Sequence, residues 1–118
     1  MKENKRKIGK HYEKIVGKYL EAAGYEILEY NFFSYAGEID IIARHKEYLV
    51  FIEVKYRKNL RKGHPLEAVS LQKQKVISKC AQYYIQKKQY IDMPVRFDVV
   101  GVLGDEISVI QNAFDFVS

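Results

Sequence analysis

The most constraining feature of this sequence is the run Tyr-Leu-Val-Phe-Ile-Glu-Val-Lys-Tyr at positions 48–56. A run this rich in apolar and aromatic residues is typical of a central β-strand that is covered on both faces. Two charged residues interrupt it, and because side chains alternate along a strand, Glu53 and Lys55 share one face with Leu49 and Phe51. Charges in such positions are costly to desolvate unless they are paired, hydrogen-bonded or bound to a metal. The run therefore predicts a partner for these charges.

The strand expected just before this run carries a third charge. Strict alternation places Glu38 and Asp40 on one face of that strand. It places Ile39 and Ile41 together on the other face. The connection between the two strands is short enough for a hairpin, and antiparallel pairing can then bring Asp40 alongside Glu53.

Hydrophobic periodicity indicates two helices and five strands. The helices are expected over residues 8–23 and from Ser70 onward, and the strands over 25–33, 38–44, 48–56, 96–103 and 106–111. Short connections between the first three strands predict an antiparallel meander. The order αβββαβ(β) predicts an α/β protein with one mixed sheet and a helix on each side. A length of 118 residues suits one domain, 1–118, because domains commonly have about 100–200 residues.

Basic residues are in excess and clustered. The formal charge of +5 comes from 20 Lys and Arg against 15 Asp and Glu. The basic clusters lie at residues 1–10, 55–64 and 73–79. Clustered cations favour polyanions, because neutralising phosphates releases counterions. Charge alone fits a solvated basic surface equally well, so it suggests nucleic acid without establishing it.

The cysteine count and the apolar runs bear on the compartment. Cys80 is the only cysteine, which excludes an intrachain disulfide and favours a reducing compartment. The longest apolar runs, such as YLVFI, are far shorter than the roughly 20 residues that a membrane span needs. No apolar segment follows the N-terminal charges as it would in a signal peptide. We expect a soluble cytoplasmic protein that makes no membrane contact.

Two adjacent carboxylates and a lysine point to phosphodiester chemistry. Close carboxylates repel unless a cation joins them, and a site built of oxygen ligands suits Mg²⁺ or Mn²⁺. Such a metal would hold a scissile phosphate and lower the pKa of a bound water, while Lys55 stabilised the attacking water or the transition state. The sequence therefore predicts the chemistry of phosphodiester hydrolysis.

At these residues the sequence resembles the PD-(D/E)xK nuclease superfamily, and more narrowly its Holliday junction resolvase-like branch. Along nearly the whole chain it is similar to the YraN family of small bacterial proteins, through GEIDII, VFIEVKYR, AVSLQK and RFDVV. The resemblance implies a restriction-endonuclease-like fold with Asp40 and Glu53 as metal ligands. Together with the basic clusters, it implies a metal-dependent nuclease that acts on DNA, including branched or structured DNA. Lys55 would be catalytic, with Glu13 in the first helix as an auxiliary carboxylate. The superfamily's proline before the aspartate is absent here, a loss common in the resolvase branch.

The basic clusters supply candidate contacts to DNA. The stretch after the third strand is polar and interrupted by glycine and proline, so we expect a mobile loop. Candidate phosphate contacts in this loop and on the second helix are Arg57, Lys58, Arg61, Lys62 and Lys73, with Lys75 a weaker candidate. A homodimer is also expected, from the resemblance to resolvases and from a sheet with an open edge.

Other interpretations of the same residues remain open. Glu53 and Lys55 could belong to a solvated edge strand, or Asp40 could form a structural ion pair with Lys55. Glu13 could simply be solvated, and Glu38 could either join the metal site or cap the hairpin. The whole chain could be a non-catalytic DNA-binding or interaction module on the same fold.

Some other polar and aromatic residues are expected to be structural. Asp98 is expected to pair with Arg96 on the same strand face. The three histidines show no ligand spacing. Three tyrosines are expected to belong to the core or to a helix surface rather than to a base-stacking platform, namely Tyr83, Tyr84 and Tyr90.

Overall fold

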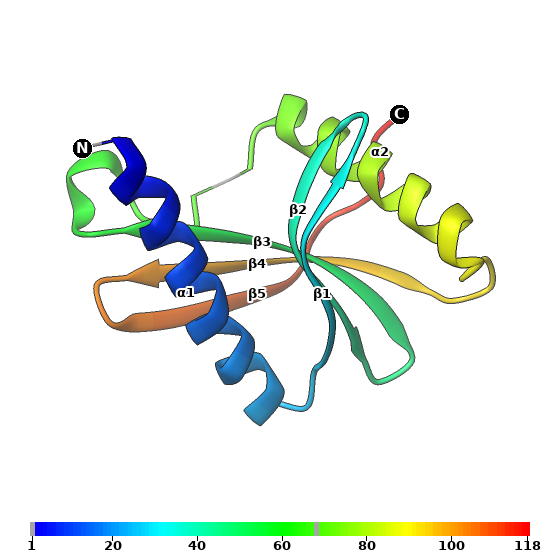
Figure 1. Ribbon diagram of the computed structural model, residues 1–118, viewed down its shortest axis with the longest axis horizontal. Helices are drawn as coiled ribbons and strands as arrows, with labels where there is room; N and C mark the ends of the chain where they lie inside the picture. The colour runs from blue at the N-terminus through cyan, green and yellow to red at the C-terminus, as the bar shows by residue number, and fades with distance from the viewer. Residues whose placement is uncertain (1, 68) are drawn as a thin grey trace.

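The computed structural model describes residues 2–67 and 69–118, with side chains from residue 9 onward. Its elements in chain order are α1 (Lys2–Ala22), β1 (Glu26–Ser34), β2 (Gly37–His45), β3 (Tyr48–Arg57), the 3₁₀ turn η1 (Leu60–Lys62), α2 (Leu71–Lys88), β4 (Val95–Leu103) and β5 (Glu106–Phe114) (Figure 1). No helix in the described part of the chain is long and apolar enough to cross a membrane.

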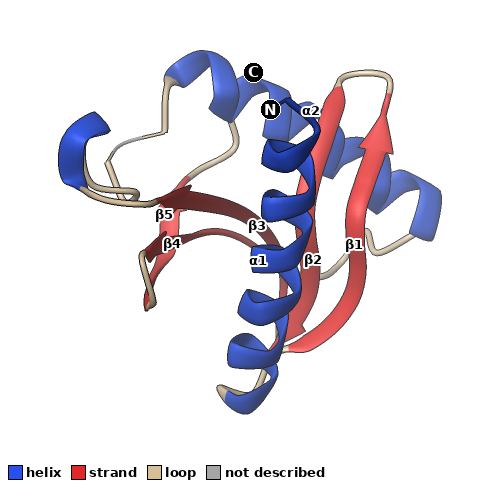
Figure 2. Ribbon diagram, turned by 60° about the vertical axis from the view of Figure 1, so that its left-hand side comes forward, coloured by secondary structure: helices blue, strands red, loops and turns tan. Residues whose placement is uncertain are grey.

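The strands form one sheet in the order β1-β2-β3-β4-β5. The first three strands make an antiparallel meander, β4 runs parallel to β3, and β5 returns antiparallel to β4. The two helices cover opposite faces of the sheet (Figure 2). The predicted α/β architecture, with a mixed sheet and a helix on each side, is confirmed. β3 lies at the centre of the sheet, which its continuous apolar run requires.

Two apolar layers hold the helices on the sheet. Beneath α2, the ring of Phe51 meets that of Tyr84 edge-on at a centroid distance of 5.9 Å. Beneath α1, Val16 and Leu20 are fully buried against the side chains of β3. One face of β3 thus packs against α2 and the other against α1, as expected for a strand whose side chains alternate between two core layers. The buried residues of the α1 layer include Val50, Ile52, Val100 and Val102.

Side chains and left-handed residues set the helix ends. The hydroxyl of Ser70 accepts a hydrogen bond from the backbone N–H of Lys73, which confirms the predicted start of α2. α2 is followed by its C-cap residue Gln89, which lies in the left-handed region with φ of 60°. α1 is followed by Gly24, whose φ of 95° suits glycine.

Two boundaries (by more than one residue), one connection and one strand face differ from the sequence expectation. α1 begins at Lys2 rather than at residue 8. The sequence pattern missed its first turns because they are polar and carry no apolar periodicity. β5 continues to Phe114 rather than ending at 111. The stretch expected as a mobile loop contains a 3₁₀ turn, Leu60–Lys62, in which the backbone N–H of Gly63 donates to the carbonyl of Leu60.

Alternation fails across Asp40 in β2. Ile39 packs in the layer beneath α2, whereas Ile41 packs in the layer beneath α1, so the prediction that they share a face is wrong. β2 pairs with β3 only from Ile41 to His45. On the other side, the residue of β1 that lies opposite Asp40 is Asn31, which has a left-handed φ of 53°. β2 therefore rotates at Asp40, where its pairing with β3 has ended and where Asn31 of β1 has a left-handed backbone.

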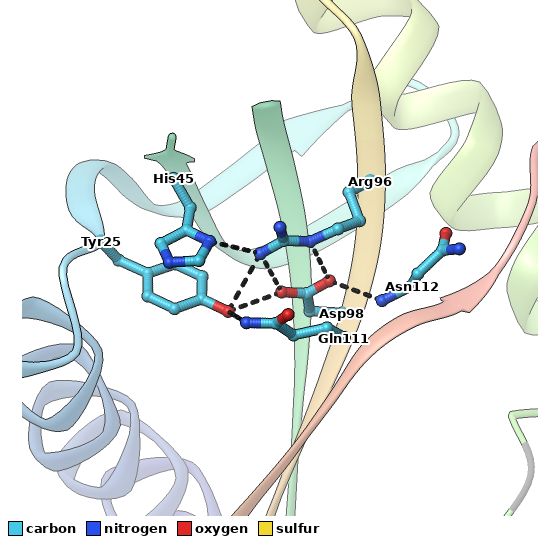
Figure 3. Close-up of polar contacts among 6 residues, drawn as sticks. All are labelled: Tyr25, His45, Arg96, Asp98, Gln111 and Asn112. Carbon is cyan, nitrogen blue, oxygen red and sulfur yellow. Dashed lines mark hydrogen bonds and ion pairs between the residues drawn. The ribbon is translucent and has the colours of Figure 1, made fainter. Parts of the chain in front are cut away.

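A buried polar network lies at the start of β4 (Figure 3). The guanidinium of Arg96 forms two 2.9 Å hydrogen bonds to the carboxylate of Asp98, which confirms the predicted pair. That carboxylate also accepts from the hydroxyl of Tyr25 at 2.8 Å and from the backbone N–H of Asn112 at 3.0 Å. The amide of Gln111 donates to the same hydroxyl at 3.2 Å. Asp98 is therefore compensated by several donors, as a buried carboxylate must be.

His45 completes this network and was not expected in it. Its Nδ1 lies 2.9 Å from Nη2 of Arg96, and its ring stacks on Tyr25 at 4.1 Å. A guanidinium can only donate, so Nδ1 accepts and the ring proton is on Nε2. Burial and the charge of Arg96 lower the pKa of His45 below its ordinary 6.5. The folded protein therefore holds this histidine neutral.

Candidate functional site

The candidate site forms where β2 and β3 stop pairing. The last backbone pair between them is Ile41 with Ile52, and beyond it the two strands diverge (Figure 1). At this point the side chain of Asp40 takes over as backbone partner, because its Oδ2 accepts the N–H of Val54 at 2.8 Å. That bond fixes the aspartate beside Glu53, the neighbour of Val54. The predicted approach of Asp40 to Glu53 is thus confirmed.

Glu53 is a nearly buried carboxyl group on the central strand. Its side chain is only 13% exposed, and the ammonium of Lys73 on α2 lies 3.5 Å from Oε2. Burial, followed by the nearby carboxyl of Asp40, raises the pKa of Glu53 to about 8, although Lys73 acts in the opposite direction. A solvated edge-strand position is excluded, because β3 pairs on both sides. One lysine does not fully compensate this carboxylate.

Glu13 approaches Asp40 from α1. Its carboxylate accepts a 2.7 Å hydrogen bond from the amide of Asn31, and the same amide donates to Glu38 at 2.9 Å. Burial raises the pKa of Glu13 to about 7; Asp40 and Glu38 add to this rise, while Asn31 opposes it. Asp40 thus lies between Glu13 on one side and Glu53 on the other. Glu13 is thus bonded and partly buried rather than simply solvated, while its role as an auxiliary carboxylate stays a prediction.

The donor set can be compared with what a divalent cation needs. Within residues 2–67 and 69–118, no group of three or more His, Cys, Asp or Glu side chains is placed to hold a metal ion. Mg²⁺ commonly binds through only one or two carboxylates, keeps several waters and engages substrate phosphates. The adjacent carboxyls of Asp40 and Glu53 fit that smaller requirement. The raised pKa of Glu53 indicates a carboxyl pair in need of positive charge.

The two lysines occupy different places. Lys55 lies on the same face of β3 as Glu53, and its ammonium donates to the backbone carbonyl of Glu67 at 3.2 Å. Across the described residues, no ion pair joins Lys55 to Asp40. The structural ion pair between these two residues, which the sequence left open, is therefore not observed. Lys73 is the cation that meets the acidic pair.

The basic loop lies beside the first turns of α1. A hollow of about 570 Å³ is lined by Gly9, Tyr56, Arg57, Lys58, Asn59, Arg61 and Lys62. Three of these cations are exposed: Lys58, Arg61 and Lys62. Arg57 is half-buried and donates to the backbone carbonyl of Tyr56 at 2.9 Å. The loop candidates are thus brought together on one surface, separate from Lys73, which lies with the acidic pair.

A second hollow adjoins the acidic residues. It encloses about 300 Å³ and is lined by Gly9, Lys10, Glu13, Asn31, Phe33 and Glu38. Gly9 borders both hollows, so the basic and the acidic surfaces meet at α1. Sequence reasoning did not identify Asn31 or Phe33. Nothing in the local pattern marks Asn31, because its importance comes from a left-handed backbone that brings two distant carboxylates together.

Comparison with known proteins places the chain in a family. Residues 12–102 match the uncharacterised protein family UPF0102, to which YraN belongs. The chain is 48% identical over 113 residues to a UPF0102 protein of Lachnoclostridium phytofermentans, which covers 95% of this chain and 96% of that protein. It is 47% identical over 109 residues to a UPF0102 protein of Fusobacterium nucleatum, with 92% of each chain covered. Over nearly its whole length, therefore, the chain belongs to the UPF0102 family.

Proposed function

We propose that this protein is a metal-dependent nuclease that hydrolyses phosphodiester bonds in DNA, including branched or structured DNA. We also propose that its mixed sheet is a restriction-endonuclease-like fold of the PD-(D/E)xK superfamily, in the resolvase-like branch. The observation that carries both proposals is the position of Asp40. It lies where two central strands diverge, between a carboxyl from α1 and a carboxyl from β3.

Asp40 and Glu53 would hold the cation. Mg²⁺ or Mn²⁺ bound there would supply a water of lowered pKa and would offset the charge that develops on the phosphate. The pKa of about 7 at Glu13 suits a group that accepts a proton near neutral pH. Glu13 would therefore act as the auxiliary carboxylate.

The cations have separate tasks in this proposal. Lys55 lies two residues after Glu53 on the same strand face and would approach the phosphate by leaving the carbonyl of Glu67. Lys73 now pairs with Glu53. If a metal neutralised the charge of Glu53, Lys73 would be released to contact the same phosphate. The basic loop would bind neighbouring phosphates, which position a nucleic acid without reading its sequence.

A cleavage panel tests the proposal. Duplex, single-stranded, flap and four-way junction DNA are incubated with the protein and Mg²⁺, Mn²⁺ or chelator. We expect metal-dependent cleavage by the wild type and its loss in Asp40→Asn and Glu53→Gln. Glu47→Gln is the matched control, because Glu47 is an exposed acid in the β2–β3 turn. Cleavage that survives both site substitutions, or no cleavage of any substrate, would contradict the nuclease proposal.

One observation favours the alternative, a non-catalytic DNA-binding module. The ammonium of Lys55 is engaged by the backbone carbonyl of Glu67, and among the described residues it forms no ion pair with Asp40 or Glu53. If that arrangement persists with DNA, the protein would bind without cutting. Calorimetric titration with Mn²⁺ separates the cases, since a binding module has no need of metal at Asp40. Binding of Mn²⁺ that is lost in Asp40→Asn supports the nuclease.

A further inference from the structure

An exposed phenyl ring stands beside the acidic residues. Phe33 is 62% exposed, although a large apolar side chain gains from burial. In the register of the β1–β2 hairpin it lies directly opposite Glu38, so the two side chains share a face. Asn31 belongs to the same face, because its amide bonds to Glu38. One face of the hairpin thus carries an aromatic ring next to the polar cluster around Asp40.

Core packing does not explain this ring. The neighbouring Phe32 fills the layer beneath α2 and meets the ring of Tyr84 at 5.0 Å. Because side chains alternate, the ring of Phe33 points away from that layer. Its nearest hollow is the one of about 300 Å³ that it lines together with Glu13 and Glu38. The ring is therefore available to a ligand that reaches the acidic residues.

The chemistry of the surroundings identifies the class of ligand. A flat apolar ring binds the face of another flat ring, and base–aromatic stacking is the common form of this contact in nucleic-acid complexes. A base on Phe33 would have its attached phosphate within the polar cluster. The adjoining basic hollow, which meets this one at Gly9, would take the next phosphates. In a duplex each base face is already covered by stacked neighbours, so only an unpaired base offers a free face.

We propose that Phe33 is a stacking platform for an unpaired base next to the bond that is cut, and that it gives the protein a preference for DNA with unpaired nucleotides. The proposal rests on the proposed function, because the acidic cluster defines where the phosphate lies. It adds a specificity-determining residue and a substrate class. Phe33 acts by binding the base and takes no part in the chemistry.

Tyr35 supplies a matched control. It is 83% exposed at the tip of the same hairpin, but its ring meets Tyr83 of α2 at 6.1 Å and lies outside the hollow. Removing either ring leaves both core layers intact, because neither residue belongs to them. The variants Phe33→Ala and Tyr35→Ala should therefore fold alike. Phe33→Trp retains a stacking face and serves as the rescue variant.

Fluorescence anisotropy with Ca²⁺ in place of Mg²⁺ measures binding while a divalent cation is available to the acidic cluster. The probes are a labelled single strand of about 12 nucleotides, within the span of known single-strand sites, and the blunt duplex of the same sequence. Phe33→Ala should weaken single-strand binding by about 5- to 150-fold, the equivalent of one stacked base. Duplex binding should change by less than about 2-fold, because every base inside a duplex is covered by its stacked neighbours and only the two end pairs have a free face. Phe33→Trp and Tyr35→Ala should bind like the wild type.

Three results would overturn the stacking proposal. Two of them are anisotropy results for Phe33→Ala: an equal loss of affinity for both probes, or no loss of affinity for either. The third is a light-scattering result, in which a dimeric wild type becomes a monomer in Phe33→Ala. That result would assign the ring to contact with a second copy of the chain. The outcome is separable from that of the nuclease proposal. If single-strand binding depends on Phe33 but no substrate is cleaved, only the nuclease proposal is contradicted. If cleavage depends on Asp40 but Phe33→Ala leaves the substrate preference unchanged, only the stacking proposal is contradicted.

Discussion

At the scale of single residues, the charge of Asp40 decides between a metal site and a structural cluster. Its carboxyl faces Glu13 and Glu53, whose pKa values are both raised by its presence. Replacing it with asparagine removes that repulsion, and the amide oxygen can still accept the N–H of Val54. Asp40→Asn should therefore leave the metal-free thermal stability unchanged or raised.

The same substitution should abolish stabilisation by metal. A ligand that binds only the folded state raises its stability, so the wild type should melt at a higher temperature with Mn²⁺ than with chelator. Asp40→Asn should melt at the same temperature in both. A mutant that loses about 3–5 kcal/mol, together with a wild type indifferent to Mn²⁺, would instead indicate a buried ion pair and would refute the metal site.

Glu53 also predicts a pH dependence of stability. Its pKa rises from 4.5 to about 8 on folding, so between these values the folded state binds more protons than the unfolded state. The free energy of unfolding in chelator should therefore fall as the pH rises from 4.5 to about 8. Urea unfolding across this range measures the slope, and Glu53→Gln should flatten it. An equal slope in wild type and mutant would show that Glu53 is not the titrating group.

His45 provides an internal contrast for that measurement. Its pKa is lowered on folding, so its contribution is complete above the ordinary value of 6.5 and is lost as the pH falls below it. Protonation would place a second cation 2.9 Å from Arg96. His45→Gln keeps an acceptor for the guanidinium and should reduce the loss of stability in acid. As the pH falls, protonation of Glu53 raises the free energy of unfolding, whereas the titration of His45 lowers it. The variants Glu53→Gln and His45→Gln therefore separate the two effects.

At the scale of elements, the loop after β3 is the clearest source of phosphate contacts. Lys58, Arg61 and Lys62 are exposed around the basic hollow. Replacing all three with alanine should weaken binding to every DNA alike. The logarithmic salt slope should fall by about 0.9 for each lost phosphate contact on duplex DNA. Lys87→Ala, on an exposed part of α2 away from this hollow, is the control, and an unchanged slope in the triple variant would place the DNA surface elsewhere.

The elements themselves were largely predictable, because each has a strong local pattern. The cap at Ser70, the meander and the central place of β3 follow from spacing and turn residues. The approach of Asp40 to Glu53 follows from the register of the hairpin, although the backbone pairing itself ends at Ile41 and Ile52. What could not be predicted is the rotation of β2 at Asp40, since it depends on the end of its pairing with β3 and on the left-handed backbone of Asn31. Those causes are tertiary, and they shape the site.

At the scale of the whole molecule, the sheet has two edges, β1 and β5. An open edge offers unpaired backbone groups to a second chain, which supports the expected homodimer. The edge of β5 is the better candidate, because β1 carries the proposed DNA face. Ile110 on β5 is 38% exposed and is available to a partner. Light scattering at high micromolar concentration should therefore show a dimer.

A pair of lysine substitutions locates that interface. Ile110→Lys places a charge on the β5 edge, a device that natural proteins use against edge pairing, and should produce monomers. Ile91→Lys adds the same charge at a residue that is 72% exposed between α2 and β4, and should leave the dimer intact. A dimer that survives in both variants would place the interface away from β5. A wild type that is monomeric throughout would refute the dimer, and each protomer would then need to bind and cut one strand alone.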